Sequence, residues 1–558
     1  GRPTTVRVAS SFGALAAGVA IAMALVARQR TGLGQRIEVP LFDATFLAIG
    51  ASGLLVDGHA AGGRPDDPWA GVFKCADGRW VQLALPTPRF VRRFVAGAGL
   101  PAEWLAGGAL EADSPARAAQ HQAMQGLFAS KPALEWEAQG VQMDVPLRLI
   151  RTRDEWLREE HARTSGAVVA VDDPELGPTW QAGPAVRLCG TPAAAPRARR
   201  SLNEPPAWGP LTLPSGAGTG GAGALSGIRV VDLTQVLAGP TAARTLAEFG
   251  ASVVKINNPR EEGAGYRWNV HRYHTDVNRG KATMLLDLKA PEGLAIFRQL
   301  ASQADVVLQN FRLGVAERLG VGYEQVRELR PDVVYGSISA YGYGGSWADR
   351  PGYEPHGQAV TGISARENGF GQPSGPGYAI NDYGTGLLGA FGIALALFHR
   401  MRTGQGQHVE VSLARTGSTH QFADFLGGGG EPSARIYQAS DGSLVAMGAE
   451  LMVTEGMPAL DCVEELSAAG VPASTVRTAP ELMRQPWVAQ HGLAITREHP
   501  GMAGAITTAG PPYRLSRTPA VPGRPVARPG YDAKEVLTSI GMADQLDELV
   551  AKGVIALE

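Results

Sequence analysis

Hydrophobic and polar positions form their clearest pattern between residues 378 and 413. Large apolar side chains recur there at spacings of one, three and four residues, which predicts a helix buried along one broad face: Leu387, Leu388, Phe391, Leu395 and Phe398. We expect this helix to end before Gly404, because glycine readily takes the left-handed conformation that follows a helix C-terminus. Residues 407–413 alternate in polarity and include β-branched side chains, so they are predicted to form a strand.

One acidic residue, Asp382, lies at the start of this predicted helix. It has two interpretations, which are compatible. In the first it is an N-cap, accepting a backbone hydrogen bond and matching the helix dipole. In the second it is a nucleophile that the helix N-terminus keeps ionised at neutral pH, and the neighbouring glycines let a substrate approach the backbone.

The chain contains an internal repeat. Moving the sequence by 372 positions aligns residues 10–41 with residues 382–413, and 14 of the 32 pairs are identical. Asp77-Gly78 and Asp441-Gly442 follow in the same order, and the Arg-Leu pairs at 187 and 514 are offset by only 327. The second copy is therefore shorter by 372 − 327 = 45 residues. We place the loss mainly after Asp441, where the first copy has a helical stretch over 89–136. This is one module present twice.

The two copies are unequal at the position of the acidic residue. The first copy has Ser10 where the second has Asp382. If Asp382 carries chemistry, the first copy cannot carry the same chemistry. The chain also begins at Gly1 rather than Met, which we interpret as a processed or incomplete product.

The second copy opens with a strand, a helix and a strand within about thirty residues, which indicates a βαβ unit of a parallel sheet. The strands are 228–234 and 251–256, and the helix is entered through Gly239-Pro240. Further strands are predicted over 283–288, 304–308 and 333–338, and further helices over 291–302 and 315–329. The fold class is therefore α/β.

The repeat and a segment rich in Gly, Pro, Ala and Ser set the expected domains. Residues 1–205 are the first copy, truncated at its N-terminus, with a large-domain remnant at 1–60 and a small domain at 61–205. Residues 206–226 are a linker. The second copy, 227–558, has a large domain (227–425), a shortened small domain (426–510) and a C-terminal return segment (511–558).

Composition excludes several classes of protein. The chain has 51 basic and 53 acidic residues, so neither a nucleic acid nor an anionic membrane is an expected partner. Cys75, Cys189 and Cys462 show no metal-binding or redox spacing, so we expect no metal and a reducing, cytoplasmic location. The apolar run at 14–26 is thirteen residues, too short to cross a bilayer, and is predicted to be a core helix.

Several groups in the second copy are candidates for ligand binding. The chain has neither a G-x-G-x-x-G nor a P-loop motif, which argues against a dinucleotide or P-loop site. Basic residues cluster near the strand ends, where parallel sheets bind ligands, although ordinary solvated charge is the alternative for each. Four consecutive glycines at 427–430 are either a flap that presents backbone N–H groups or a plain linker. The histidines are scattered and form no evident Ser/His/Asp set.

A series of motifs in the second copy resembles the class III CoA-transferases, also called the CaiB/BaiF family. The motifs are DLTQVLAGP, GASVVKI, NRGKATMLLDLK, ADVVLQNFRLGVAERLG, SISAYGYGG, PGYEPHGQAVTG and the segment around Asp382. They cover nearly all of residues 228–413, and the resemblance resumes in both small domains. It implies a Rossmann-like parallel-sheet large domain with a small α+β domain in an interlocked-ring fold. It also implies an intramolecular pseudo-dimer or a homodimer.

The resemblance also implies the site. Asp382 matches the family's catalytic aspartate, and acyl-CoA and a carboxylic acid are the implied substrates, with no tightly bound cofactor. The aspartate attacks the thioester to form an anhydride and then an aspartyl-CoA thioester, and donors in the glycine loop stabilise the oxyanions. A basic family position falls on Asn258, so we expect Arg260 to substitute for it. The remaining CoA contacts fall on Val236, Ala238, Lys281, Asn310, Phe311 and Arg318, with Gly427, Gly428, Gly429 and Gly430 as a mobile loop.

Two alternatives remain beside the transferase. Acyl-CoA racemases share the fold, but their histidine falls on Tyr353, and tyrosine is a poor base at neutral pH. A CoA-binding protein without turnover is suggested by Ser10 and by the two truncations. Whether the shortened second small domain encloses a substrate is in doubt from the sequence alone.

Overall fold

The computed structural model describes residues 6–60, 69–105, 115–194, 223–259, 272–367, 373, 377–425, 435–447, 456–500, 502 and 504–557. Its centre is an eight-stranded sheet in the order β22-β12-β11-β10-β13-β14-β15-β9. The six middle strands are parallel and the two edge strands are antiparallel. This confirms the predicted α/β class. The strands are β9 (Arg187–Leu188), β10 (Arg229–Asp232), β11 (Ser252–Asn257), β12 (Lys281–Leu286), β13 (Val306–Gln309), β14 (Val334–Ser339), β15 (His408–Ser412) and β22 (Ile555–Ala556).

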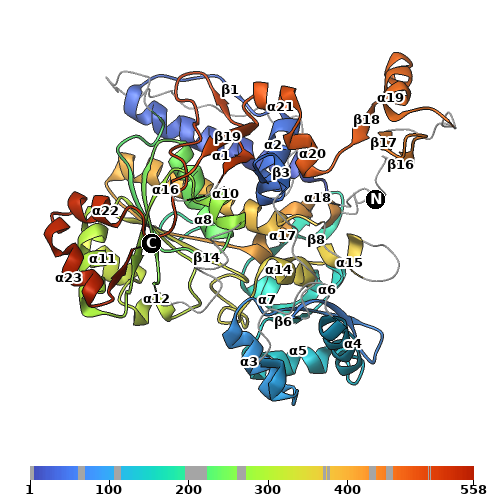
Figure 1. Cartoon of the computed structure of the whole chain (residues 1–558), viewed down its shortest axis with the longest axis horizontal. Coiled ribbons are helices and arrows are strands. Elements are labelled where there is room, and N and C mark those ends of the chain that lie inside the picture. Colours follow the sequence, from blue (N-terminus) through green and yellow to red (C-terminus); the bar gives the residue numbers. More distant parts are fainter. Residues whose placement is uncertain are drawn as a thin grey trace.

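Helices cover both faces of this sheet (Figure 1). The buried apolar residues of α1, α8 and α16 form one core, and those of α11, α13, α22 and α23 form the other. The single helix predicted over 315–329 is wrong, because the chain breaks at Gly320, whose φ of 75° is left-handed. The helices are α1 (Val8–Thr31), α8 (Ala238–Glu248), α10 (Arg272–Val277), α11 (Pro291–Gln303), α12 (Val315–Arg318), α13 (Tyr323–Leu329), α16 (Ile380–Thr403), α22 (Ala533–Ser539), η3 (Ala543–Gln545) and α23 (Leu546–Ala551).

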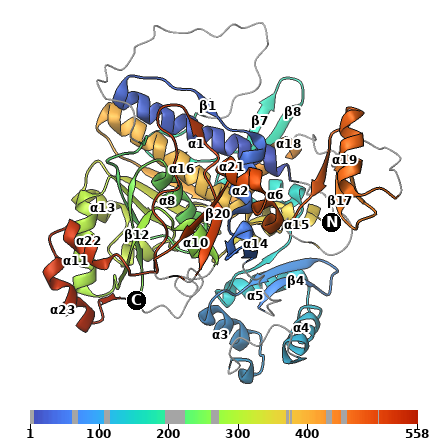
Figure 2. The ribbon, with the colours of Figure 1, turned by 45° about the horizontal axis from the view of Figure 1, so that its top comes forward.

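Helices α1 and α16 are the two copies of one element and lie side by side (Figure 2). Helix α16 ends at Gly404 with a φ of 75°, as predicted. The predicted burial of 14–26 is confirmed by Val19 and Val26, both 0% exposed. The predicted length is wrong: α1 and α16 each have 24 residues and are long and apolar enough to cross a membrane by length and composition. At Gly386 a Cβ would come within 2.5 Å of Thr241 of α8, so a larger residue cannot pack there.

The two copies exchange strands. β9 of the first copy pairs with β15 of the second, while β21 of the second copy pairs with β1 of the first. A further sheet, β19-β20-β2-β3, again combines both copies. The chain therefore interlocks its own halves. The additional elements are β1 (Ile37–Glu38), α2 (Leu41–Ile49), η1 (Gly50–Gly53), β2 (Leu55–Val56), β3 (His59–Ala60), β19 (Ala494–Glu498), β20 (Ala505–Ala509) and β21 (Arg514–Leu515).

Each copy carries a small lobe built on a three-stranded antiparallel sheet, and the two lobes lie apart in both views (Figures 1 and 2). Asp77 accepts the N–H of Ala133, and Asp441 accepts the N–H of Ala459, so the repeat extends to single hydrogen bonds. The two copies are offset by 441 − 77 = 364 residues at the aspartates but by only 459 − 133 = 326 residues at the two alanines. The predicted deletion thus falls where the first copy has α3 and α4.

The first lobe contains β4 (Ala70–Lys74), β5 (Trp80–Ala84), α3 (Pro88–Gly97), η2 (Ala102–Leu105), α4 (Pro115–Phe128), α5 (Ala133–Gln142) and β6 (Leu147–Leu149). The second contains β16 (Arg435–Gln438), β17 (Leu444–Met447), α19 (Ala459–Ala468) and β18 (Ala473–Val476). The remaining elements connect the lobes to the body: α6 (Arg153–Arg158), α7 (Glu160–Thr164), β7 (Val168–Asp173), β8 (Gly177–Ala182), α14 (Glu354–Thr361), α15 (Ile363–Glu367), α17 (Leu413–His420), α18 (Phe422–Phe425), α20 (Ala479–Met483) and α21 (Pro486–Gln490).

Candidate active site

Asp382 lies in the first turn of α16 but does not cap it. The N-cap is Ala379, which makes no side-chain cap, and Asp382 is the third residue of the helix. Its backbone N–H donates to the carboxylate of Glu354, the first residue of α14. The N-cap interpretation is therefore wrong. Glu354 takes the acceptor role at this helix start, and the Asp382 side chain does not serve as a cap.

Glu354 and Asp382 form a coupled pair of carboxyl groups. Glu354 is buried and also accepts hydrogen bonds from the Asn381 N–H (3.0 Å) and from the Gln358 amide. Burial raises the pKa of Glu354. Burial and the nearby charge of Glu354 raise the pKa of Asp382 well above its usual value. Asp382 is half-buried, and two neighbouring carboxylates do not both ionise readily, so Glu354 opposes the ionisation of Asp382 that the helix N-terminus was expected to favour.

Two cavities meet at Asp382. One, of about 370 Å³, is lined by residues of the first small lobe, and we call it the lobe cavity. The other, of about 160 Å³, is lined by the turn after β10 and the end of β13, and we call it the turn cavity. Val236, Leu237 and Tyr353 line both cavities together with Asp382. A molecule that reaches from one cavity to the other passes the carboxyl group.

One wall of the lobe cavity comes from the first copy, whereas Asp382 and the rest of the lining belong to the second copy. Ala70, Gln82, Ala84 and Pro86 line it. The Gln82 side chain is fixed, because its Nε2 donates to the carbonyls of Gly71 (3.0 Å) and Leu83 (2.9 Å). No described residue of the second lobe lines either cavity. Among the described residues, the lobe that lines the Asp382 site is that of the first copy.

Several contacts hold the first lobe against the second copy, and two of them lie beside the turn cavity. The Phe90 ring packs edge-on against Tyr353, with centroids 6.4 Å apart. Asp144 of the lobe forms an ion pair with Arg312, at 2.7 Å from Nη2, and a second one with Arg93. These arginines hold the pKa of Asp144 below its usual value despite partial burial. The lobe is docked where the turn cavity opens.

The turn cavity contains four residues that the family resemblance had assigned to CoA: Val236, Ala238, Asn310 and Phe311. Val236 has a φ of 67°, a strained conformation for a β-branched residue that is found most often at functional sites. Asn310 holds the turn in place, because its amide accepts from the Gln235 N–H and donates to the Gln235 carbonyl, both at 2.8 Å. Asn310 is therefore a positioning residue for this turn.

The structure does not support the expectation for Lys281. Its ammonium group is 0% exposed and donates to Asp232 (2.8 Å), the Pro240 carbonyl (2.9 Å) and Asn278 (2.9 Å). Burial lowers the pKa of Lys281 to about 7. A CoA phosphate cannot reach a group enclosed in this way, so Lys281 has a structural role.

The other residues that the resemblance assigned to CoA binding do not line the two cavities or lie outside the described residues. Arg318 is exposed on α12 and lines neither cavity. Arg260 and Gly427–Gly430 lie outside the described residues. Ser10, the counterpart of Asp382, is exposed on α1. Glu354 and Gln82 were missed from the sequence. The signal for Glu354 is the acidic residue of PGYEP directly before a helix, whereas nothing local marks Gln82.

Comparison with protein-family profiles finds the same module twice in the chain. The profile of CoA-transferase family III matches residues 2–204 and again residues 225–451. The chain belongs to CoA-transferase family III. The double match confirms the predicted family, its tandem form and the enzyme class.

Named relatives include both transferases and a racemase. A succinate–glutarate CoA-transferase of Agrobacterium fabrum is 40% identical over 203 residues, which is 34% of this chain and half of that protein. The human alpha-methylacyl-CoA racemase is 35% identical over 40% of this chain and 61% of its own. A probable CoA-transferase of Mycobacterium tuberculosis, Rv1866, is 26% identical and aligns with 98% of this chain and 79% of its own.

The fold also matches a solved structure. A CaiB/BaiF family protein from Brucella suis superimposes with a TM-score of 0.50 at 25% identity. The match covers 57% of this chain and 99% of that one. One such subunit therefore corresponds to little more than half of the tandem chain, as expected for a module that is present twice.

Proposed function

We propose that the chain transfers CoA from an acyl-CoA to a carboxylic acid, with Asp382 as its single nucleophile. The observation that carries this proposal is the position of Asp382 where the two cavities meet. The turn cavity carries four of the family's CoA positions, and the lobe cavity offers a separate space for the acyl group. The proposed substrates are soluble, and we infer a cytoplasmic enzyme whose two copies act as an intramolecular pseudo-dimer.

The reaction requires only the carboxylate and the CoA thiol. Asp382 attacks the thioester carbonyl, and the C–S bond breaks to leave an aspartyl anhydride and a CoA thiolate. The thiolate attacks the aspartyl carbonyl, releasing the donor acid and leaving an aspartyl-CoA thioester. The acceptor carboxylate attacks this thioester, and the same steps in reverse deliver its acyl-CoA and restore Asp382.

The carboxyl pair controls this reaction. Asp382 must lose its proton to attack, and the charge of Glu354 opposes that loss. Glu354 in turn accepts the N–H groups of Asn381 and Asp382 and so fixes the backbone from which the nucleophile projects. Glu354 is a positioning residue that also sets the pH at which Asp382 becomes reactive.

The lobe cavity favours acids with an uncharged tail. Its described lining is apolar, aromatic, hydroxyl and amide, and its only ionisable carboxyl groups are Glu354 and Asp382. The second carboxylate of a dicarboxylic acid would face these two groups without a described cation beside it. We therefore expect monocarboxylates to be better acceptors than succinate or glutarate, although relatives are named for those two acids.

Racemisation is the second candidate, supported by the human racemase relative. The nearby histidine is not placed for it: His356 is 0% exposed, its Nε2 contacts the Pro146 carbonyl and its Nδ1 accepts the Tyr353 N–H. Incubation of a 2-methylacyl-CoA in deuterated water separates the two reactions. Racemisation incorporates deuterium at the α carbon, whereas transfer leaves that position unlabelled.

The decisive experiment combines a panel of acyl-CoAs and acids with hydroxylamine trapping and mass spectrometry. We expect CoA exchange and a single hydroxamate, on Asp382. Exchange with an adduct on any other residue, or α-carbon deuteration without exchange, would refute the proposal.

A further inference from the structure

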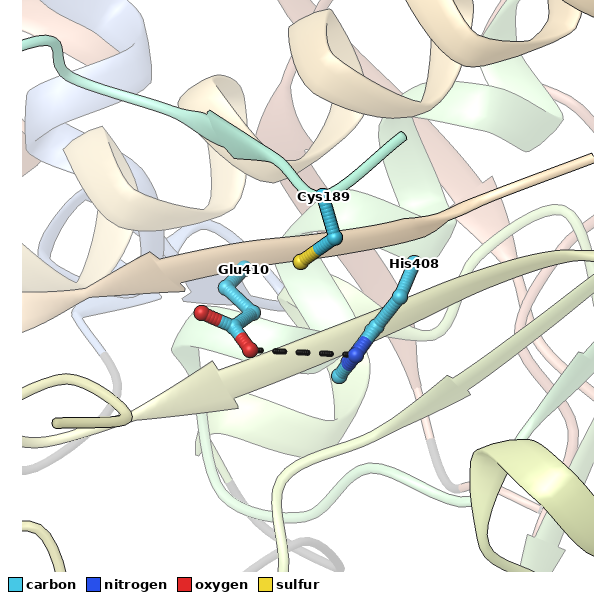
Figure 3. Close-up of side chains that lie close together, drawn as sticks. All are labelled: Cys189, His408 and Glu410. Atoms are coloured by element: carbon cyan, nitrogen blue, oxygen red, sulfur yellow. Dashed lines mark ion pairs between the residues drawn. The ribbon is translucent and has the colours of Figure 1, made fainter. Parts of the chain in front are cut away.

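The strand exchange brings together three potential metal ligands that are far apart in the sequence. Cys189 follows β9 of the first copy, while His408 and Glu410 lie on β15 of the second copy (Figure 3). One ligand atom from each lies within 4.8 Å of the other two. We propose that Cys189, His408 and Glu410 bind a zinc ion that links the two copies. Spacing along the chain had predicted no metal site, and these contacts argue against that expectation.

The strand register produces this cluster. Glu410 is directly opposite Arg187, and the Cys189 N–H donates to the His408 carbonyl at 2.9 Å. Residues 408 and 410 project from the same face of β15 because side chains alternate along a strand. The thiol, the imidazole and the carboxylate therefore converge at one edge of the large sheet.

The distances and the donor types suit zinc. His408 Nδ1 lies 3.7 Å from Glu410 Oε1, which is too long for a hydrogen bond. Tetrahedral zinc with bonds of about 2.0–2.3 Å separates its ligand atoms by roughly 3.3–3.8 Å. Sulfur, imidazole and carboxylate donors favour zinc over magnesium or calcium, which take oxygen ligands. Cys189 is exposed, so a water molecule can complete the coordination.

The surroundings orient the imidazole as a ligand. His408 Nε2 lies 2.7 Å from Ser337 Oγ, and Gln309 Nε2 donates to the same oxygen at 2.8 Å. A histidine that donates through one ring nitrogen presents the lone pair of the other to a metal. The ring is stacked on Tyr323 at 5.1 Å and is held edge-on by Tyr335 at 5.5 Å. Burial lowers the pKa of His408 to about 4, so the ring is neutral at pH 7.

Two charges oppose the ion. Arg187 donates to Glu410 Oε2 at 2.7 Å, leaving Oε1 to face the histidine. The Arg187 side chain is 51% exposed, so it can turn to solvent when an ion binds. The second charge is Arg415. It lowers the pKa of Glu410, but burial has the larger effect and the pKa of Glu410 is raised overall. The Cys189 residue is exposed, but partial desolvation of its thiol and the nearby Glu410 carboxylate raise its pKa to about 11, so the thiol must release its proton to solvent when the Zn–S bond forms.

The repeat supplies an internal control. The ladder of β1 with β21 is the counterpart of β15 with β9, and Glu38 is again opposite an arginine, Arg514. At the positions of His408 and Cys189 it has Arg36 and Ser516, which bond to each other through the Arg36 N–H and the Ser516 hydroxyl at 3.0 Å. Only the ladder of β9 with β15 has the three ligand types.

The test uses the full chain after treatment with a chelator. Zinc is titrated in competition with a chromogenic chelator, and cobalt(II) is used as a spectroscopic probe. We expect one zinc per wild-type chain, a thiolate-to-cobalt absorption band and a zinc-dependent rise in Tm. Cys189→Ser and His408→Ala should each weaken zinc binding by at least about tenfold, since even outer-shell partners contribute 10–100-fold.

Three further measurements make the outcome decisive. Cys189→Ser should lose the cobalt band and the zinc-dependent Tm shift, while Ser516→Ala on the other ladder should keep both. Arg187→Ala should bind zinc at least as tightly as wild type, because it removes the opposing charge. Zinc affinity should fall as the pH is lowered. Wild-type protein that binds zinc no more tightly than Cys189→Ser, or an Arg187→Ala variant that loses binding, would overturn the proposal.

Discussion

At the scale of single residues, the central finding is that Asp382, the proposed nucleophile, shares its environment with a second carboxyl group. Asp382 does not cap its helix, and Glu354 accepts its backbone N–H. Burial and the charge of Glu354 both raise the pKa of Asp382. The acidity of Asp382 is therefore lowered first by desolvation and then by the charge of Glu354 on α14.

Removing the Asp382 carboxylate should abolish transfer without damaging the fold. Asp382→Asn keeps the size of the side chain, and the Asp382 side chain makes no helix cap. The free energy of unfolding should therefore change by about 1 kcal/mol or less, while transfer should disappear because an amide cannot form the anhydride. Denaturant unfolding and CoA-exchange assays measure the two effects. Ser10→Ala is the matched control and should keep wild-type turnover; loss of activity in Ser10→Ala, or full activity in Asp382→Asn, would contradict a single centre.

The pH dependence of transfer should report the carboxyl pair. Because Asp382 must be ionised and its pKa is raised, the rate should increase with pH on its acid side. In Glu354→Gln the neighbouring charge is lost, the ionised form of Asp382 is favoured, and this acid limb should move to lower pH. Measurement of kcat/KM against pH tests this. Glu292→Gln, an exposed carboxylate on α11, is the control and should keep the wild-type profile. An acid limb that stays in place in Glu354→Gln would show that another group controls the rate.

At the scale of elements, charged residues of β10, β11 and β12 form a buried cluster beside the turn that carries the proposed CoA site. Asp232 of β10 contacts Lys281 at 2.8 Å and Lys255 of β11 at 3.7 Å, and all three residues are almost fully buried. Both lysines contribute to lowering the pKa of Asp232. The cluster supports the turn that contains Val236, and it does so without direct contact with a ligand in the turn cavity.

Lys281→Ala should therefore destabilise the fold. It leaves Asp232 with the longer Lys255 contact as its ion pair, beside two hydrogen bonds from Thr234, and breaking a buried ion pair costs about 3–5 kcal/mol. Arg318→Ala, at an exposed position, should change the free energy of unfolding by less than about 0.5 kcal/mol. If Arg318 holds a CoA phosphate, its loss should weaken CoA binding by about 1–3 kcal/mol. Denaturant unfolding and calorimetric CoA titration give both quantities; a stable Lys281→Ala variant with weakened CoA binding would restore the sequence-based assignment.

At the scale of the whole molecule, the two copies have divided one site between them. The second copy supplies Asp382, Glu354 and the turn cavity, and the first copy supplies the lobe that encloses the other cavity. The first copy has Ser10 at the position of Asp382, and the second copy lacks the helices that correspond to α3 and α4 among its described residues. These differences are complementary, which fits the proposal of one centre per chain.

Docking of the first lobe should matter for activity more than for stability. Asp144→Asn weakens the ion pair with Arg312, keeps the size of the side chain and suits the left-handed backbone at that position (φ 52°). The pair is partly exposed, so the free energy of unfolding should fall by about 1 kcal/mol or less, while kcat/KM should fall more strongly. Asp332→Asn is a matched control, since Asp332 also contacts two arginines but lies away from the lobe. Equal activity in the two variants would show that lobe docking does not limit transfer.

The sequence by itself determined the elements and their family. Apolar periodicity marked α16 and α1, β-branched runs marked the parallel strands, and identity between the halves revealed two unequal copies. These are local signals, carried by residues within one turn, one strand or one aligned stretch. The split of α12 from α13 was missed because its cause is the backbone conformation at Gly320.

Only the tertiary structure decided what surrounds Asp382. The Glu354 neighbour, the wall from the first lobe, the burial of Lys281 and the cluster of Cys189 with His408 and Glu410 all join segments that are distant in the chain. Such contacts depend on strand order and on the exchange of strands between the copies, which no local pattern encodes. Burial then changes the chemistry of the residues, because a lysine or a carboxyl group removed from water has a different pKa and different partners from one on the surface.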